Sequence, residues 1–252
     1  PLFWVKSLRK KFSCLEGNVA CINELKAKLQ NIRDMGYIES MRSGNTGIGY
    51  TLETLLGIDE NNDSGADIDG EVELKTKRKD GSARTTSFCQ NPIWITKPRD
   101  IIKKYGWRDS EKVERLNFYP SLRYGSETPQ GLGIEIENSS LFLTGKDNER
   151  LAELPLEVVR FRFRQKFSEL VLVLAQRTKE SRKREKFLYD EAYYCRGLSV
   201  DKIGELLRDG KIVVEPRMWL DTESGKLRDR GMAIRMSDKW TKELFSNVER
   251  LL

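Results

Sequence analysis

The stretch DSGADIDGEVELKTKRKDG, residues 63–81, sets a run of carboxylates directly before a run of lysines and arginines. Within it, residues 71–77 (EVELKTK) alternate in character, and successive side chains of a β-strand point to opposite faces. One face would carry Val72, Leu74 and Thr76. The other face would be charged, and its residues are Glu71, Glu73, Lys75 and Lys77. The pattern predicts a half-buried strand with one charged face.

This charged face has the residue types of a metal site that holds a phosphate. Glu73 and Lys75 stand two positions apart, so their Cα atoms would lie roughly 6.5 Å apart on one face. Mg²⁺ in proteins takes one or two carboxylates, waters and a phosphate oxygen of the substrate. Lys75 could hold the attacking water and help to deprotonate it, or neutralise charge on the phosphate in the transition state. A second acid is needed, and we expect Asp67, with Asp69 as the competitor because a turn could present either one.

The same arrangement also occurs in unrelated proteins. An upstream Asp followed by E-x-K can lie on an exposed strand face whose alternating charges only meet solvent. The stretch alone therefore leaves two interpretations open, a metal-dependent phosphodiesterase of the restriction-endonuclease type and a solvated strand.

The composition narrows the classes of function. The 252 residues carry a net charge of +6, which favours a polyanionic partner such as nucleic acid. The chain has no histidine, which excludes Ser–His and Cys–His catalysis and His-ligated metals. No window approaches the ~18 apolar residues of a membrane helix, and the first residues lack the pattern of a signal peptide. No C-x-x-C spacing supports a zinc site, so we expect inert thiols in a reducing, cytoplasmic compartment at Cys14, Cys21, Cys89 and Cys195.

The periodicity of the remaining sequence predicts a mixture of helices and strands. Helices are predicted over residues 18–35, 48–56, 99–106, 155–167, 199–210 and 238–252. Ser199 would be the N-cap of the fifth helix and Gly210 its stop. Strands are predicted over residues 71–77, 169–178, 185–195, 211–221 and 231–236, the last two paired, with a hairpin over 132–145. A further strand over residues 85–89 would lie beside residues 71–77. The mixture indicates one α/β domain.

The segment GNTGIGYTLETLLGIDENNDSGADIDGEVELKT, residues 44–76, resembles the MvaI/BcnI family of restriction endonucleases, relatives of the MutH nicking enzyme. In that family a glycine-rich loop precedes a helix with an inward Glu, and an Asp followed by Phe, Ile or Leu precedes E-x-K. Here the helix acid is Glu53. Asp67, followed by Ile68, fits better than Asp69, although the turn is one residue longer than the family pattern and leaves both open.

Further segments extend the resemblance from about residue 30 to the end, with a weak middle third. They are TTSFCQNP (85–92), IIKKYGW (101–107), residues 194–221, and SGKLRDRGMAIRM (224–236). The family has a His before the D-[RH]-G triplet, where this chain has Arg228. Arginine reads guanine through O6 and N7, so a different central base pair is expected.

The resemblance implies a fold and an organisation. We expect a mixed α+β, restriction-endonuclease-like fold of the PD-(D/E)xK superfamily, with a mixed central sheet, flanking helices and two lobes around a DNA cleft. Residues 1–17 would be a basic extension of a single endonuclease domain, 18–252. The catalytic lobe would include about residues 40–110, and the recognition lobe about 215–236.

The resemblance also implies an activity. We expect a monomeric Type II enzyme that hydrolyses double-stranded DNA at a short CC-N-GG-like site and nicks the two strands in turn, with a cognate methyltransferase as genetic partner. Asp67 and Glu73 would bind Mg²⁺ (or Mn²⁺), Lys75 would position the water, and Glu53 would assist. The expected DNA-binding residues are Asn45, Arg217, Lys226, Arg228, Asp229 and Arg230.

Other interpretations stay open at this stage. A MutH-like nicking enzyme of repair would share the chemistry, and a DNA-binding module without catalysis would share the charge. The loop SGNTGIG lacks the G-K-[ST] of a nucleotide-binding loop, so we expect a helix-capping turn there, or amides that meet a DNA phosphate. LRDRG (227–231) could read bases or form a tight turn held by internal Arg–Asp pairs. RFRFRQKF (160–167) and RTKESRKREK (177–186) would contact phosphates only.

Overall fold

The structure is a computed structural model that describes residues 18–58, 65–68, 70–81, 84–178 and 184–252. The chain divides into two compact units. Unit 1 comprises Pro1–Ala83, Phe163–Leu198 and Phe245–Leu252, and unit 2 comprises Arg84–Arg162 and Ser199–Leu244. The expected extension, residues 1–17, lies outside the described residues. Residues 84–110, which were expected in the catalytic lobe, belong to unit 2.

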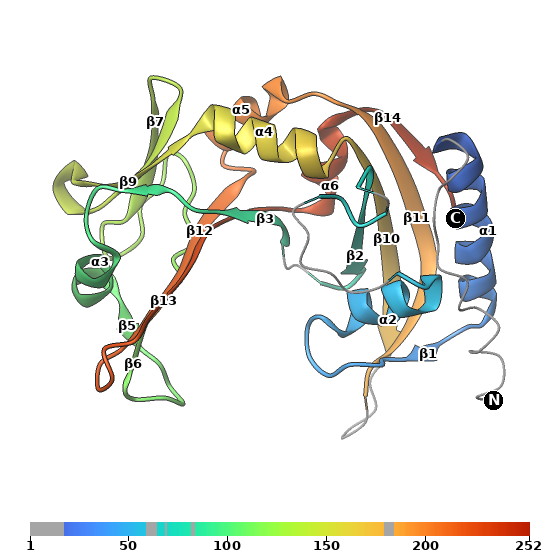
Figure 1. The fold of residues 1–252 in the computed structure, drawn as a ribbon, viewed down its shortest axis with the longest axis horizontal. Coiled ribbons are helices and arrows are strands. Elements are labelled where there is room, and N and C mark those ends of the chain that lie inside the picture. Colours follow the sequence, from blue (N-terminus) through green and yellow to red (C-terminus); the bar gives the residue numbers. More distant parts are fainter. Residues whose placement is uncertain (1–17, 59–64, 69, 82–83, 179–183) are drawn as a thin grey trace. The chain divides into compact units, whose positions relative to one another are not determined.

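In the described part of unit 1, five strands form a mixed sheet (Figure 1). Its order is β1–β11–β10–β2, and β14 also pairs with β11. β2 runs parallel to β10, whereas β1, β10 and β14 run antiparallel to β11. The bounds are β1 (Ile38–Glu39), β2 (Val72–Arg78), β10 (Glu169–Thr178), β11 (Lys186–Leu198) and β14 (Phe245–Arg250). β2 is thus an edge strand.

Two helices, α1 (Asn18–Asp34) and α2 (Gly47–Leu56), cover one face of this sheet. Their apolar side chains form a core with alternate residues of β10 and with Val72 and Leu74 of β2, the face that the alternation predicted to be apolar. In the parallel ladder Leu74 lies opposite Val171, and Lys75 lies opposite Leu172. Because side chains alternate along a strand, Lys75 points to the face that α1 and α2 do not cover.

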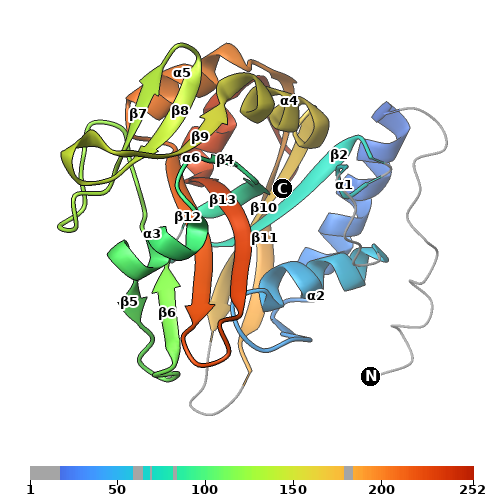
Figure 2. The same ribbon diagram turned by 60° about the vertical axis from the view of Figure 1, so that its left-hand side comes forward.

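Unit 2 contains two antiparallel sheets among its described residues. The first has the order β3–β13–β12–β6–β5, and Figure 2 shows its long β12–β13 hairpin. Its strands are β3 (Thr85–Gln90), β5 (Trp107–Arg108), β6 (Arg115–Phe118), β12 (Val213–Asp221) and β13 (Leu227–Met236). The second has the order β4–β9–β8–β7, with strands β4 (Ile93–Trp94), β7 (Gly133–Glu137), β8 (Ser140–Thr144) and β9 (Arg150–Pro155).

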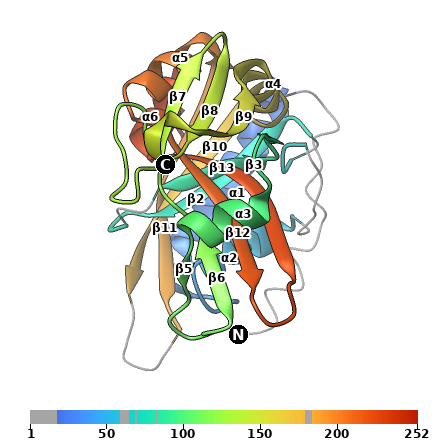
Figure 3. The ribbon, with the colours of Figure 1, turned by 90° about the vertical axis from the view of Figure 1, so that its left-hand side faces the viewer.

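Helices complete unit 2, and Figure 3 shows α3 beside β5 and β6. The helices are α3 (Pro98–Tyr105), α5 (Asp201–Arg208), α6 (Asp238–Glu243) and the 3₁₀ turn η1 (Lys146–Asn148). α4 (Leu156–Lys166) begins in unit 2 and ends in unit 1. Lys166, the last residue of α4, therefore belongs to unit 1.

Three predictions of local structure are wrong. The predicted helix over residues 238–252 is helical only over α6, and the rest forms β14. The strand at residues 85–89 pairs with β13 in unit 2 and not with β2. α5 has Val200 at its N-cap position and no side-chain cap hydrogen bond, so Ser199 does not cap it.

The described cysteines also differ from expectation. Among the described cysteines, Cys89 and Cys195 are thiols, but Cys21 of α1 is disulfide-bonded. The expectation of inert free thiols is therefore wrong at Cys21. None of the described helices is long and apolar enough to span a membrane.

Candidate active site

Strand β2 brings Glu73 and Lys75 together, as the two-residue spacing predicted. The Lys75 ammonium pairs with Oε1 of Glu73 and lies 4.0 Å from Oδ2 of Asp67. The side chain of Lys75 is 20% exposed, whereas Glu73 is fully buried. The predicted charged face is therefore not a solvated one at Glu73.

A tight turn places Asp67 beside the strand. Ile68 pairs with Val72 through backbone hydrogen bonds, and Gly70 adopts a positive φ of 75° that favours glycine. The turn reverses the chain so that Oδ2 of Asp67 accepts a hydrogen bond of 2.9 Å from the backbone N–H of Leu74. Asp67 is thereby fixed between Glu73 and Lys75 along the strand. Asp69, the competing ligand, lies outside the described residues.

The carboxylate of Glu73 has an unusual environment. Burial raises its pKa, the charge of Lys75 lowers it, and the charge of Asp67 raises it again, with a net upward shift. Its Oε2 atom is buried and has no hydrogen-bond partner among the described residues. A buried acceptor without a partner is costly, so this oxygen is suited to a cation that is not part of the chain.

The residues present fit a hard divalent cation. Asp67 and Glu73 supply carboxylate oxygens, which Mg²⁺ prefers, and two carboxylates are sufficient when waters and a phosphate complete the shell. Among the described residues, no three of His, Cys, Asp or Glu gather closely enough to hold a metal ion. The fit therefore rests on Asp67 and on the free oxygen of Glu73.

Glu53 lies on α2 and not on the strand that carries Glu73 and Lys75. It is half-buried on α2, and a Cβ added at Gly49 would lie 3.4 Å from its Oε1 and 3.3 Å from Oγ1 of Thr76. Thr76 shares the α2-covered face of β2 with Leu74, whereas Glu73 and Lys75 point to the other face. The structure does not bring Glu53 into one group with Asp67 and Glu73.

Lys166, at the end of α4, was not singled out by the sequence. Its ammonium lies 3.6 Å from Oε1 of Glu73, and its side chain is 17% exposed. Oε1 thus faces two lysines, while Oε2 meets no hydrogen-bond partner within the described ranges. The basic run RFRFRQKF held the signal, but nothing in the run distinguishes its one lysine from its arginines as a neighbour of residue 73.

The other expected residues of the reading loop lie just before β13 or at its start. Lys226, Arg228, Asp229 and Arg230 are exposed. Asp229 accepts hydrogen bonds from the indole N–H of Trp94 (2.8 Å) and the backbone N–H of Gly231 (2.7 Å). Asp229 thus shapes the backbone from which the two arginines project.

Arg217 belongs to a charged cluster within unit 2. Its Nε and Nη2 atoms donate to Oε2 of Glu215 at 3.2 Å each, and Nη2 also donates to Oγ1 of Thr86. Arg235 donates to both oxygens of Glu215 at 2.9 and 3.0 Å, and the Ser121 hydroxyl donates to Oε1 at 3.0 Å. Arg217 is therefore held by neighbours, with its side chain 27% exposed.

The comparison with protein families decides the identity. The family model described as the MvaI/BcnI restriction endonuclease family matches residues 26–245, most of the chain. The chain belongs to the MvaI/BcnI restriction endonuclease family. The predicted resemblance is confirmed, and membership makes the chain a DNA endonuclease.

Solved structures of the restriction endonuclease MvaI show the same fold. Its complex with a cognate DNA substrate has a TM-score of 0.75 at 24% identity, covering 91% of this chain and 98% of that chain. MvaI in the absence of DNA gives a TM-score of 0.51 at 21% identity, covering 92% and 97%. The predicted mixed α+β restriction-endonuclease fold is confirmed. No curated protein matches the chain.

Within this MvaI/BcnI family member, sequence reasoning found the Asp67–Glu73–Lys75 grouping and missed two features of it. One is Lys166, and the other is the burial of Glu73. Both depend on the pairing of β2 with β10 and on the end of α4, which come from residues about 90 positions further along the chain.

Proposed function

We propose that this chain is a Type II restriction enzyme that hydrolyses both strands of duplex DNA at a short, CC-N-GG-like site with Mg²⁺, for which Mn²⁺ can substitute. The observation that carries the proposal is the buried Glu73, whose free oxygen lies in a group with Asp67 and Lys75. On a solvent-exposed strand, water would hydrate both oxygens of this carboxylate. A buried oxygen without a partner therefore argues against the interpretation as a solvated strand.

Asp67 and Glu73 would hold the ion, and Asp67 is already oriented by its hydrogen bond from the Leu74 amide. When bound, the ion would supply Lewis-acid stabilisation of the charge that develops on the scissile phosphate. The raised pKa of Glu73 indicates that its ionised form lacks sufficient compensation from the chain itself. A bound cation would provide that compensation.

Lys75 would hold the attacking water and, as a cation, stabilise the hydroxide that develops as the water loses its proton to solvent. Its ammonium pairs with Oε1 of Glu73, so it lies beside the proposed ion-binding oxygen. Lys166 would share the charge of Oε1 and leave Lys75 freer to turn toward the water. Glu53 would assist from α2, on the other side of the edge strand.

Sequence recognition would use the exposed start of β13. Arg228 and Arg230 would contact base edges, while Asp229 fixes the backbone between them through Trp94 and Gly231. Lys226, Arg217 and Asn45 would also contact DNA, where Arg217 is oriented by Glu215. We further propose a monomer that acts in the cytoplasm beside a cognate methyltransferase.

The test is digestion of a sequenced plasmid with Mg²⁺, Mn²⁺ or EDTA, followed by mapping of the ends. The expected result is metal-dependent cleavage of both strands at one short site. Glu73→Gln should be inactive but still bind DNA, whereas Glu71→Gln, which removes an exposed acid two positions earlier, should remain active. Cleavage in EDTA, or binding without any cleavage, would overturn the proposal, and nicks confined to one strand would favour a MutH-like enzyme.

A further inference from the structure

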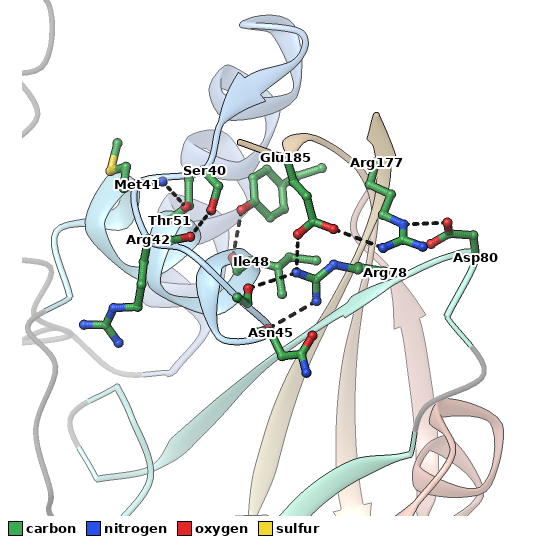
Figure 4. Close-up of polar contacts among 12 residues, drawn as sticks. Ser40, Met41, Arg42, Asn45, Ile48, Thr51, Arg78, Asp80, Arg177 and Glu185 are labelled. Atoms are coloured by element: carbon green, nitrogen blue, oxygen red, sulfur yellow. Dashed lines mark hydrogen bonds and ion pairs between the residues drawn. The ribbon is translucent and has the colours of Figure 1, made fainter. Parts of the chain in front are cut away.

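An arginine at the end of the catalytic strand holds the loop that leads into α2 (Figure 4). Arg78 is the last residue of β2. Its Nη1 donates to the backbone carbonyl of Asn45 at 3.1 Å, and its Nη2 donates to that of Gly44 at 3.4 Å. The Asn45 side chain points away from the guanidinium in Figure 4. Arg78 therefore grips the backbone of the loop and not its side chains.

The guanidinium of Arg78 is itself fixed by charge. Nη2 donates to Oε2 of Glu185 at 2.6 Å, and Oε1 of Glu185 accepts from Nη1 of Arg177 at 3.0 Å. Burial raises the pKa of Glu185, but hydrogen bonds from Arg78 and Arg177 outweigh it and the net shift is downward. Arg177 is in turn bound to Asp80 (2.6 Å). With a side chain only 15% exposed, Arg78 is poorly placed to contact DNA directly.

The gripped loop continues into α2 as one hydrogen-bonded unit. The Gly47 N–H donates to the Gly44 carbonyl (3.2 Å), the same carbonyl that Arg78 holds. The backbone N–H of Met41 donates to Oγ1 of Thr51 at 3.0 Å. A displacement of the loop would therefore be passed on to the first turns of α2.

The first turns of α2 lie close to the catalytic strand. A Cβ added at Gly49 would make tight contacts with Oγ1 of Thr76 in β2 (3.3 Å) and Oε1 of Glu53 (3.4 Å). The buried hydroxyl of Tyr189 donates to the carbonyl of Ile48 at 2.8 Å. Burial raises the pKa of Tyr189, while the charge of Arg78 lowers it and that of Glu53 raises it, so both charges lie within electrostatic range of this phenol.

We propose that Arg78 is a positioning residue for DNA cleavage, which fixes α2 and its Glu53 against the strand that carries Glu73 and Lys75. The inference rests on the proposed function, in which Glu53 assists the reaction. A buried charge pair often adds little to stability. The pair of Arg78 and Glu185 is therefore better explained by the geometry that it fixes. A small misplacement of an assisting group costs about a hundredfold in rate in other enzymes.

The experiment compares Arg78→Gln with Arg177→Gln. Both remove a guanidinium that contacts Glu185, but only Arg78 contacts the loop. Hydrogen exchange of the amides of residues 44–53 reads the loop without any activity. Single-turnover cleavage and DNA affinity in metal-free buffer separate the chemical step from binding. We expect Arg78→Gln to accelerate exchange and to slow single-turnover cleavage at saturating DNA by at least about tenfold, a loss larger than any fall in affinity that comes from the loosened Asn45. Arg177→Gln should leave the exchange of residues 44–53 unchanged, and any effect that it has should fall on DNA affinity, because Arg177 belongs to the basic run expected to contact phosphates.

A second experiment tests whether Arg78 acts on cleavage through Glu53. If Arg78 acts by placing Glu53, then Arg78→Gln should cost little more in a Glu53→Gln background, since coupled residues are not additive. Arg78→Lys keeps the charge but cannot make both hydrogen bonds to the loop, so it should give an intermediate cleavage rate. If Arg78→Gln does not fold, Arg78→Lys replaces it in the same experiments.

The outcomes are distinct. Unchanged exchange in Arg78→Gln would show that Arg78 does not hold the loop. A loss confined to DNA affinity would overturn the positioning role. Multiplicative effects of Arg78→Gln and Glu53→Gln would show that Arg78 does not act through Glu53. A wild-type chain that cleaves no DNA would instead overturn the proposed function.

Discussion

Two buried glutamates, Glu73 in unit 1 and Glu215 in unit 2, meet basic residues in different ways. Glu215 is 8% exposed, and both of its oxygens accept hydrogen bonds from the chain. Glu73 is fully buried and its Oε1 is paired with Lys75 and Lys166, while its Oε2 has no partner in the described part of the chain. Burial and charge are similar in the two places, but the number of satisfied oxygens differs.

The difference is the one expected between an anchoring glutamate and a metal ligand, the role proposed for Glu73. A glutamate whose two oxygens are used within the chain can orient arginines, as Glu215 orients Arg217 and Arg235. A glutamate with one free oxygen can accept an ion from outside. Counting the satisfied acceptor atoms therefore distinguishes the two roles where the sequence, with E-x-K at one place and E-x-R at the other, does not.

The largest expected effect is the loss of cleavage in Glu73→Gln. The amide keeps the shape but cannot hold a divalent cation well, so the rate should fall about a thousandfold or more, with DNA binding preserved. Single-turnover cleavage in saturating Mg²⁺ and a gel-shift titration measure the two properties. If Glu73→Gln cleaves at the wild-type rate, Glu73 is an anchor like Glu215 and the comparison fails.

Glu215→Gln should act on stability instead. Removing this charge leaves Arg217 and Arg235 partly buried without their carboxylate, which costs about 3–5 kcal/mol when a buried pair is broken. Urea denaturation monitored by circular dichroism gives the change in unfolding free energy. Ser121→Ala, which removes one neutral hydrogen bond to the same carboxylate, is the milder control, at about 1 kcal/mol. A stable Glu215→Gln protein would contradict the anchor role.

Arg230→Ala should reduce discrimination between sites. Arg230 is exposed on β13, in contrast to Arg217, which Glu215 holds. If it reaches a base edge, its loss should cost about 1–3 kcal/mol of preference for the cognate base. Rates on the cognate site and on single-base variants provide the measurement. An unchanged ratio would mean that the loop is a structural turn. Lys183, in the basic run expected to contact phosphates only, lies outside the described residues.

The smallest expected effect is that of Lys166→Met. Of the two described cations at Oε1 of Glu73, the change leaves Lys75, so Lys75 should be held more firmly there and be less free to orient water. We expect cleavage to slow about tenfold, equivalent to roughly 1.4 kcal/mol. Lys75→Ala, measured in parallel, should lose far more. Equal losses in the two variants would show that the lysines share one role.

The site could be predicted from sequence only as far as local geometry reaches. The alternation of residues 71–77 predicts β2 and the shared face of Glu73 and Lys75, because the period of a strand is a backbone property. Whether that face meets water depends on β10 and α4, which no local pattern specifies. The burial of Glu73 and its contact with Lys166 therefore depend on tertiary structure.

The predicted C-terminal helix failed for a similar reason. Residues 238–252 have apolar residues at helical spacing, but Phe245–Arg250 pairs with β11 over five registered positions. The hydrogen bonds and packing gained at an available sheet edge outweigh a modest helix propensity. The same applies to residues 85–89, whose strand character was predicted correctly and whose partner was not.

The interleaved construction of unit 1 has a consequence for synthesis on the ribosome. β2, with the proposed catalytic residues, is made early, but its sheet also requires β10, β11 and finally β14, and Leu251 is buried in the same core. A nascent chain that stops before residue 245 therefore lacks part of the sheet that supports Glu73 and Lys75. For an enzyme that cuts DNA, this order of assembly delays a competent nuclease until β14 and Leu251 have been translated.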